Sequence, residues 1–139
     1  MSGPADHVTV LVAHGSRNPR TAADHVALCN AVAEAAGDSP ATGHDAHRAS
    51  PSVLPAFLEM AEPSIGDAID AAVATGTRSV TVLPLFIHLG NHVERDIPAV
   101  IDAARNRHPD VAIHLRPHIG AGADFVRLVA YAVGGSPRD

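Results

Sequence analysis

Residues Pro84 to Pro98 read PLFIHLGNHVERDIP, and this stretch decides the fold. The apolar run Val80 to Ile87 predicts a strand that is buried on both faces. A short loop with two imidazoles follows the strand, and a helical pattern resumes after the loop. Because ligands bind at the carboxyl ends of the strands in an open α/β sheet, we expect His88 and His92 to lie where chemistry takes place.

The composition describes a small domain with an aliphatic core. At 139 residues the chain is long enough for one domain, and we expect a single domain over residues 1–139 with its core at about 8–133. Hydrophobic residues make up 46% of the chain, but there are only three Phe, one Tyr and no Trp. The core must therefore be built from Ala, Val, Leu and Ile, as in layered α/β proteins. The chain also offers no aromatic platform for nucleic-acid bases.

The charge and the cysteine count exclude several classes of protein. All ten basic residues are arginine and the formal net charge is -5, which favours neither a polyanion-binding groove nor a membrane surface. The single cysteine, Cys29, excludes an internal disulfide and cannot hold an iron–sulfur cluster within one chain. We expect no signal peptide, and the sequence contains no apolar run of membrane-spanning length. We therefore expect a cytoplasmic protein whose partners include neither nucleic acid nor membrane.

The amino-terminal unit is a strand, a turn and a helix. The β-branched run Val8–Ala13 predicts a buried strand, and the segment HGSRN follows it. Asn18 is a good N-cap and Pro19 suits the first helical position, so a helix is predicted from here to about Ala36. Free backbone N–H groups and the helix dipole favour an anion at residues 14–17. The spacing of apolar positions predicts the core face of the helix: Val26, Cys29, Val32, Ala33 and Ala36.

The middle of the chain has two possible interpretations. Residues 37–52 are polar and turn-rich and are interpreted as a loop, which carries His44 and His47. The next apolar run, Val53–Leu58, predicts the second strand, and Pro55 favours an edge position for it. A helix over Val53–Ala61 is the competing interpretation.

The remaining elements complete an alternation of strands and helices. Strands are predicted over Ser79–Ile87 and Val111–Leu115, and the helix between them tolerates Pro98 only near its first turn. Two more helices are predicted, one over Ala123–Val133 and one with the apolar face Ile65, Ala68, Ile69, Ala72 and Val73. Alternating strands and helices require right-handed crossovers. The predicted fold class is α/β, a four-stranded parallel sheet with helices on both faces and strand order 2-1-3-4.

Candidate metal-binding and catalytic side chains follow three of the predicted strands. His14 and His92 are the best candidates for metal ligands, because imidazole suits late first-row divalent metals. His88 is a candidate third ligand four residues before His92, although Gly90 argues against a regular helix between them. Glu59 is a candidate ligand or general base. A closed structural site would use four ligands, typically with cysteine, so this set fits a metal that must be released.

Other polar residues receive an anion-binding or a structural interpretation. Arg17 and Arg95 are candidates for binding carboxylate or phosphate, because guanidinium captures these groups through two hydrogen bonds. Glu62 is equally explained as a charge favoured by the end of a helix. His118 is an outside candidate because it follows a strand end. The remaining histidines are interpreted as structural, exposed or solvated: His7, His25, His44, His47, His108 and His114.

Four segments carry a resemblance to a known family. They are HGSR after the first strand, AFLEMAEPSI in the middle, LPLFIHLGNHVERDIP at the third strand, and RPHIG after the fourth. Together they resemble the short, single-domain CbiX-type sirohydrochlorin chelatases, over nearly all of the chain from Val8 to about Val133. The pattern GxHVxxDIP after PLF is the most specific part. The chain departs from the family pattern at His88, where the family usually has another residue, and in residues 37–52.

The resemblance implies an activity and a set of partners. It implies a class II chelatase, a lyase that inserts a divalent metal into sirohydrochlorin in cobalamin or siroheme biosynthesis. The metal, Co²⁺, Fe²⁺ or Ni²⁺, is a substrate, and no organic cofactor is implied. The family's two metal-binding histidines match His14 and His92. Two units form the cleft in that family, so a homodimer is expected.

The resemblance and the residues lead to one mechanism. His14 and His92 would deliver the metal to the pyrrole nitrogens, while Glu59 or a histidine removes the two N–H protons. Sirohydrochlorin carries eight carboxylates, and the turn containing Ser16 and Arg17, together with Arg95, would bind them.

Two other functions stay open at this point. A non-catalytic metal carrier would use the same histidines but leaves the anion-binding turn without a ligand. A histidine-type phosphatase would use His14 as a phosphohistidine nucleophile, but such sites have an arginine directly before the histidine, where this chain has Ala13. Turnover of sirohydrochlorin with a divalent metal separates the chelatase from both.

Overall fold

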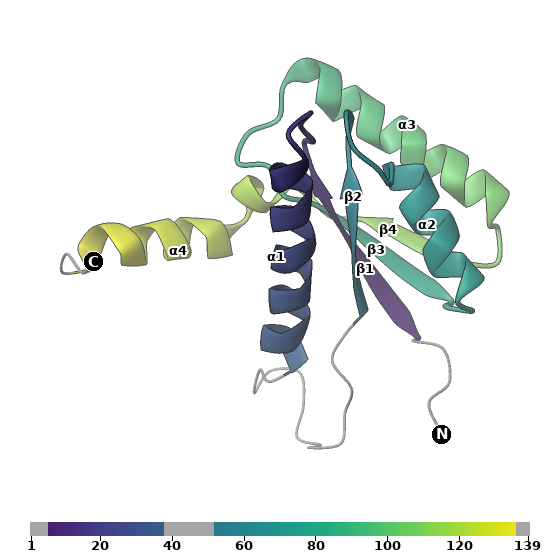
Figure 1. Cartoon of the computed structure of the whole chain (residues 1–139), viewed down its shortest axis with the longest axis horizontal. Helices are drawn as coiled ribbons and strands as arrows, with labels where there is room; N and C mark the ends of the chain where they lie inside the picture. The colour runs from purple at the N-terminus through teal and green to yellow at the C-terminus, as the bar shows by residue number, and fades with distance from the viewer. Residues whose placement is uncertain (1–5, 38–51, 136–139) are drawn as a thin grey trace.

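The computed structural model describes residues 6–37 and 52–135. Strands and helices alternate along this part of the chain, as Figure 1 shows. The elements are β1 (His7–Ala13), α1 (Pro19–Gly37), β2 (Ser52–Phe57), α2 (Ile65–Ala74), β3 (Ser79–Pro84), α3 (Asn91–Arg107), β4 (Ala112–Leu115), the 3₁₀ turn η1 (Ile119–Ala121) and α4 (Ala123–Gly134). None of the described helices combines the length and the apolar character needed to cross a bilayer.

The four described strands form one parallel sheet in the order β2-β1-β3-β4, which confirms the predicted fold class and strand order. The segment around Pro55 is a strand, so the competing helix over Val53–Ala61 is wrong. β2 lies at the edge of the sheet. An edge strand pairs on one side only, so the missing N–H of Pro55 does not interrupt the hydrogen bonds in the interior of the sheet. In the register of the sheet, Leu11 of β1 lies between Pro55 of β2 and Leu83 of β3.

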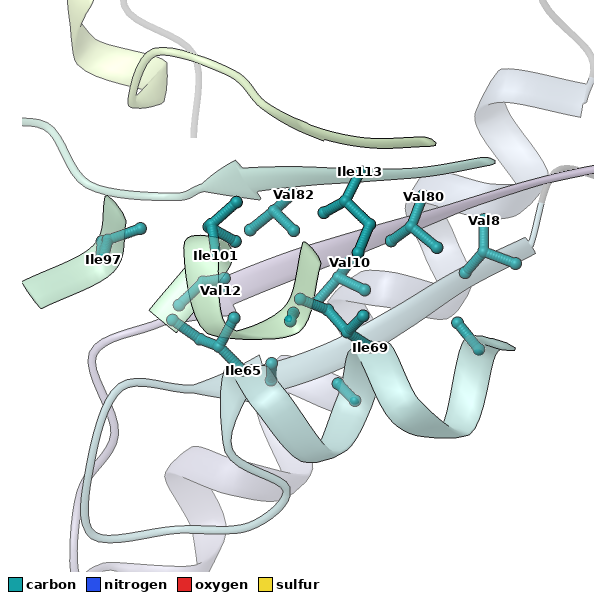
Figure 2. Packing of buried hydrophobic residues seen from close by; sticks show 14 residues of the cluster. Val8, Val10, Val12, Ile65, Ile69, Val80, Val82, Ile97, Ile101 and Ile113 are labelled. Atoms are coloured by element: carbon teal, nitrogen blue, oxygen red, sulfur yellow. The ribbon is translucent and has the colours of Figure 1, made fainter. Parts of the chain in front are cut away.

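One face of the sheet carries the main hydrophobic core. Alternate residues of β1, β3 and β4 point to this face, where α2 and α3 cover them (Figure 2). Val10 and Val82 are fully buried there against helix residues that include Ile69 and Ile101. Burying a side chain of this size stabilises the fold by about 1.5–3 kcal/mol. The predicted core positions of α2 are confirmed for Ile65, Ala68, Ile69 and Ala72.

On the other face of the sheet, α1 lies over β2. Asn18 caps this helix, because its Oδ1 accepts a hydrogen bond from the Arg20 N–H at 3.0 Å, and Pro19 is the first helical residue, as predicted. His25 is buried under the helix. Its Nε2 donates to the carbonyl of Leu11 at 3.0 Å, and its ring meets the ring of Phe57 edge-on.

The predicted core face of α1 is partly wrong. Cys29 is buried, and burial raises the pKa of its thiol. Val26 and Val32, which were also expected in the core, are 42% and 36% exposed. The reason is that α1 covers a narrow part of the sheet, so only the stripe through His25 and Cys29 is enclosed.

α4 forms where it was predicted but extends away from the sheet (Figure 1). It contains no buried residue, and it packs mainly on η1, the turn that precedes it. The face of β3 and β4 opposite the core is therefore incompletely covered. Thr81 and Leu83 are half-buried and His114 is exposed on that face.

Two predicted boundaries around the third strand are wrong. β3 was expected to continue to Ile87 but ends at Pro84, because the Phe86 carbonyl accepts the Gly120 N–H of η1 in place of a strand partner. α3 begins at Asn91, which puts Pro98 inside the helix and beyond its first turn. His92 is therefore a helical residue and not a loop residue. The fourth strand begins at Ala112, one residue later than expected.

Candidate functional site

The ends of β1 and β2 bring His14 next to Glu59. Backbone pairing continues past both strands, since the Leu58 N–H donates to the Ala13 carbonyl at 2.9 Å and the Glu59 N–H donates to the His14 carbonyl at 3.1 Å. Both side chains are exposed at this edge. The order of the sheet thus sets an imidazole beside a carboxylate at the carboxyl ends of neighbouring strands, as the sequence predicted.

Gly15 makes this close approach possible. Its φ is +104°, a conformation that residues with a Cβ rarely adopt. A Cβ built at this position would lie 1.7 Å from the carbonyl oxygen of Glu59. The glycine of the HGSR segment is therefore required for the contact between the two strand ends.

The segment after β3 supports the ring of His14. Phe86 contacts that ring edge-on, with 6.0 Å between the ring centroids. A second close approach fixes this segment, because a Cβ on Gly120 would lie 1.9 Å from the carbonyl oxygen of Ile87. The strand-end segments after β3 and β4 therefore meet backbone to backbone, as those after β1 and β2 do.

His92 lies in the first turn of α3 and pairs with Asp96. Its Nε2 is 2.8 Å from Asp96 Oδ2, one helical turn further on, and both side chains are largely exposed. This contact places a carboxylate directly beside the His92 imidazole on the face of α3 that lines the site. Asp96 was not among the predicted site residues. Its i, i+4 spacing from His92 is the signal that would have identified it, had the helix been predicted to begin at Asn91.

These side chains line one hollow, which we call the His14–His92 hollow. It has a volume of about 560 Å³. The residues that line it are His14, Leu58, Glu59, His92, Val93, Asp96, Ala99 and Val100. The structure thus brings together both predicted metal ligands, the predicted base and one further carboxylate.

His88 lies in a neighbouring hollow. That hollow has a volume of about 220 Å³ and is lined by Phe86, Leu89, Gly90 and His88, with His14 and Val93 shared with the His14–His92 hollow. As expected from Gly90, no regular helix joins His88 to His92, since Gly90 is the N-cap of α3. In residues 6–37 and 52–135, no group of three or more His, Cys, Asp or Glu side chains is gathered closely enough to hold a metal ion.

The predicted anion-binding residues Ser16, Arg17 and Arg95 do not line either hollow. Ser16 is half-buried, and its Oγ accepts a hydrogen bond from the Asn18 N–H at 3.1 Å, which shapes the turn before α1. Arg17 in this turn and Arg95 on α3 are exposed. Both guanidinium groups are therefore accessible to a ligand that reaches beyond the hollow.

The other candidates are structural or lie elsewhere. Glu62 is exposed and does not line either hollow, and His118 lines a separate hollow of about 140 Å³ with Glu94 and Arg116. The structural or exposed interpretation is confirmed for four histidines: His7 bonds Ser79, His25 bonds Leu11, His108 bonds Asp70, and His114 is exposed. His44 and His47 lie outside the described residues.

Known proteins resemble this chain along most of its length. A family model described as CbiX matches residues 8–135. The sirohydrochlorin ferrochelatase of Bacillus subtilis is 30% identical over 120 residues, which are 86% of this chain and 41% of that protein. The chain therefore spans less than half the length of this curated relative.

Two solved structures share the fold. The first, a cobalamin (vitamin B12) biosynthesis CbiX protein from Marinobacter aquaeolei, has a TM-score of 0.69 and 28% identity, and the match covers 91% of this chain and 93% of that chain. The second, the sirohydrochlorin chelatase SirB of Bacillus subtilis subspecies spizizenii in complex with cobalt, has a TM-score of 0.66 and 27% identity. That match covers 92% of this chain and 50% of the SirB chain.

Proposed function

The chain belongs to the CbiX family, and from this premise we propose that it is a chelatase that inserts a divalent metal ion, Co²⁺ or Fe²⁺, into sirohydrochlorin. The observation that carries the proposal is the single hollow that His14, Glu59, His92 and Asp96 line at the carboxyl edge of the sheet. Relatives named sirohydrochlorin ferrochelatase and sirohydrochlorin cobaltochelatase support the choice of substrate.

In this proposal His14 and His92 hold the incoming metal. Imidazole binds Co²⁺, Fe²⁺ and Ni²⁺, and the rest of the coordination sphere is supplied by water and then by the macrocycle. Both rings are exposed, so the ion can enter from solvent and leave toward the substrate without a change of fold. His88, in the adjoining hollow, is available as a third ligand during transfer. The metal is a substrate of the reaction, and no organic cofactor takes part.

The reaction also requires a proton acceptor. Metal insertion forms bonds from the pyrrole nitrogens to the metal and breaks two N–H bonds, so two protons must leave. Glu59 lies in the same hollow as both histidines and is exposed, which makes its carboxylate the best acceptor near the metal. The histidines themselves accept protons once they have released the metal.

Recognition of the substrate needs positive charge that the chain as a whole lacks. With a formal net charge of -5, the protein must bind an anionic tetrapyrrole through local groups. Arg17 and Arg95 are exposed, and Ser16 and Arg17 lie in the turn at the amino end of α1. Exposed Met60 and Ile87 offer apolar surface near the same edge for the flat ring.

We also propose that two copies form the cleft. One chelatase-like domain offers a single edge of loops, which cannot enclose both faces of a macrocycle. A two-fold dimer would set two such edges against each other around one substrate.

The test is a turnover assay with matched variants. Purified protein is mixed with sirohydrochlorin and Co²⁺, Fe²⁺ or Ni²⁺ in parallel, and the absorption spectrum of the tetrapyrrole is followed against a control without enzyme. His14→Ala and His92→Ala should each remove most of the acceleration. The control is His7→Ala, which removes an imidazole at the opposite end of β1. Metal binding without acceleration by the unmodified protein would instead identify a metal carrier.

A further inference from the structure

His14 faces a second histidine besides His92. It lines the His14–His92 hollow and also the smaller hollow of about 220 Å³, which His88 lines from the segment after β3. We call the smaller one the His14–His88 hollow. The two hollows share only His14 and Val93, so each of the other two histidines faces His14 across a different hollow.

The three imidazoles are not placed to surround one metal ion. In residues 6–37 and 52–135, no three side chains of His, Cys, Asp or Glu are close enough together to bind a common ion. A neutral imidazole has only one nitrogen with a free lone pair, so His14 coordinates one ion at a time. A metal ion bound by His14 and His88 therefore occupies a second position, which is filled in alternation with the position at His14 and His92.

The segment that carries His88 is held in place on both sides. Before it, the Phe86 carbonyl accepts the Gly120 N–H at 3.0 Å, and the backbones of Gly120 and Ile87 are in close contact. After it, α3 begins with Gly90 as its N-cap. Only the side chain of His88 has to rotate to direct its imidazole into the hollow, and a ligand carried by a fixed backbone is well placed to bind a metal.

The imidazole of His88 has no structural role in the described part of the chain. It is exposed, and no hydrogen bond or ion pair there involves its ring. In contrast, the rings of His7, His25 and His108 bond other protein groups. The volume of the His14–His88 hollow equals that of several water molecules at about 30 Å³ each, so an ion can enter with part of its hydration shell.

The two hollows differ in charge. Glu59 and Asp96 line the His14–His92 hollow, whereas none of the described residues that line the His14–His88 hollow is acidic. Carboxylates attract a divalent cation, so the ion is held more strongly beside His92 than beside His88. An ion that first binds beside His88 consequently moves to a lower free energy when it passes to His92.

We propose that His14 and His88 form a loading position for the divalent metal ion, from which the ion passes to His14 and His92. His14 stays bound during this transfer and only its partner histidine changes. Water completes the coordination of the ion in both positions. The inference rests on the proposed function, because it adds a step before metal insertion at the site assigned there.

Binding of Co²⁺ in the absence of tetrapyrrole tests for the second position. Calorimetric titration compares the unmodified chain with His88→Ala, His92→Ala and the double variant. In the unmodified background, His88→Ala should change the dissociation constant by less than about twofold, because the stronger position remains. In the His92→Ala background, the same substitution should raise it by at least about fivefold, because His14 then loses its remaining imidazole partner.

Two other patterns would overturn the loading position. A large loss of affinity from His88→Ala alone would show that all three histidines bind one ion together. No effect of His88→Ala in either background would show that His88 is not a ligand. The control is His114→Ala, which removes an exposed imidazole that lines neither hollow and should have no effect in either background.

A crystal structure of the His92→Ala variant locates the ion. Crystals soaked in Co²⁺ should give an anomalous difference peak between the imidazoles of His14 and His88. A peak between His14 and Glu59 would contradict the loading position, because it would show that the ion stays in the larger hollow when His92 is absent.

The loading role also predicts a kinetic effect. With saturating sirohydrochlorin and varied Co²⁺, His88→Ala should lower kcat/KM for the metal by at least about threefold and have a smaller effect on kcat. An unchanged kcat/KM would overturn the loading role. The expected binding pattern in a protein without turnover would contradict the proposed function alone, whereas turnover without binding that depends on His88 would contradict the loading position alone.

Discussion

Asp96 lies against the imidazole of His92 on the first two turns of α3. His92 Nε2 is 2.8 Å from Asp96 Oδ2, so the carboxylate holds one edge of the ring at the start of α3. Partners of this kind usually fix the orientation of a metal-binding histidine and raise its basicity. Asp96 is therefore a positioning residue for the proposed site.

Asp96→Asn should weaken metal binding. The amide keeps the shape of the side chain but not its charge, so we expect the affinity for Co²⁺ to fall by about 10–100-fold. Titration of Co²⁺ into the protein without tetrapyrrole measures this effect. Glu94→Gln, which neutralises a carboxylate in the first turn of the same helix, is the control. Equal affinities for Asp96→Asn and the unmodified protein would contradict the role given to this residue.

Gly15→Ala should disrupt the site and reduce stability. The new methyl group would meet the Glu59 carbonyl at 1.7 Å and the residue would have to keep a φ of +104°. We expect the free energy of unfolding to fall by about 1–3 kcal/mol or more, as measured by urea denaturation. Gly90→Ala is the matched control, because a Cβ at that position meets nothing within 4 Å. If Gly15→Ala proves no less stable than Gly90→Ala, the close approach is not required.

At the scale of elements, Asp70 joins α2 to the end of α3. Its Oδ1 accepts hydrogen bonds from His108 Nε2 at 2.7 Å and from Arg107 Nη2 at 3.0 Å. The hydrogen bond from His108, with the bond and charge of Arg107, lowers the pKa of the Asp70 carboxyl, although partial burial opposes this shift. A carboxyl with a lowered pKa in the folded state stabilises the fold above its unfolded pKa of about 3.9, and this contribution is lost as the pH falls through the folded value.

Asp70→Asn should therefore destabilise the protein in a pH-dependent way. The pair is partly exposed, so we expect the free energy of unfolding at pH 7 to fall by only about 0.2–1 kcal/mol. The difference from the unmodified protein should disappear as the pH is lowered below about 4. Thermal unfolding at several pH values measures it, with Asp110→Asn, at an exposed turn before β4, as the control. A difference that stays constant down to low pH would show that the charge of Asp70 is not its cause.

Apolar runs made the four strands predictable, because each is a short apolar segment bounded by turn residues. The start of α3 was not predictable in the same way. Pro98 suggested a helix that begins late, whereas Gly90 at the N-cap begins it early and leaves the proline in the interior. Because α3 begins at Asn91, His92 is a helical residue. Its i, i+4 relation to Asp96 could not be recognised while His92 was expected in a loop. Similarly, the periodicity of α1 could not reveal how narrow a strip of the sheet the helix covers.

At the scale of the whole molecule, the proposed site belongs to one chain. His14 and His92 line the same hollow within a single copy, although they are far apart in the sequence. The strand order made this proximity predictable, since His14 follows β1 and His92 follows β3, its neighbour in the sheet. The position of α4 was not predictable, because its apolar pattern indicates a buried helix, whereas in the structure it packs mainly on η1 and has no buried residue.

A mixture of two inactive variants should consequently remain inactive. In dimers formed by co-expression of His14→Ala and His92→Ala chains, every copy lacks one ligand, and a site within one copy cannot be restored. Turnover of the purified mixed dimer measures this. If each site took one histidine from each copy, about half of the sites in the purified mixed dimer would be intact, and a recovery of that size would contradict an intrachain site. Co-expression of His14→Ala with the unmodified chain is the positive control.

The contacts at Gly15 and Gly120 join neighbouring strand ends through backbone atoms alone. The shape of this edge therefore does not depend on the identity of the side chains that it carries. Donor atoms at positions 14, 59 and 88, on or next to these joined segments, can be exchanged, for example sulfur for nitrogen or oxygen, while the segments keep their positions. A library of such exchanges would vary the preference among metal ions on a constant scaffold, which makes this edge a starting point for designing chelatases with new metal specificities.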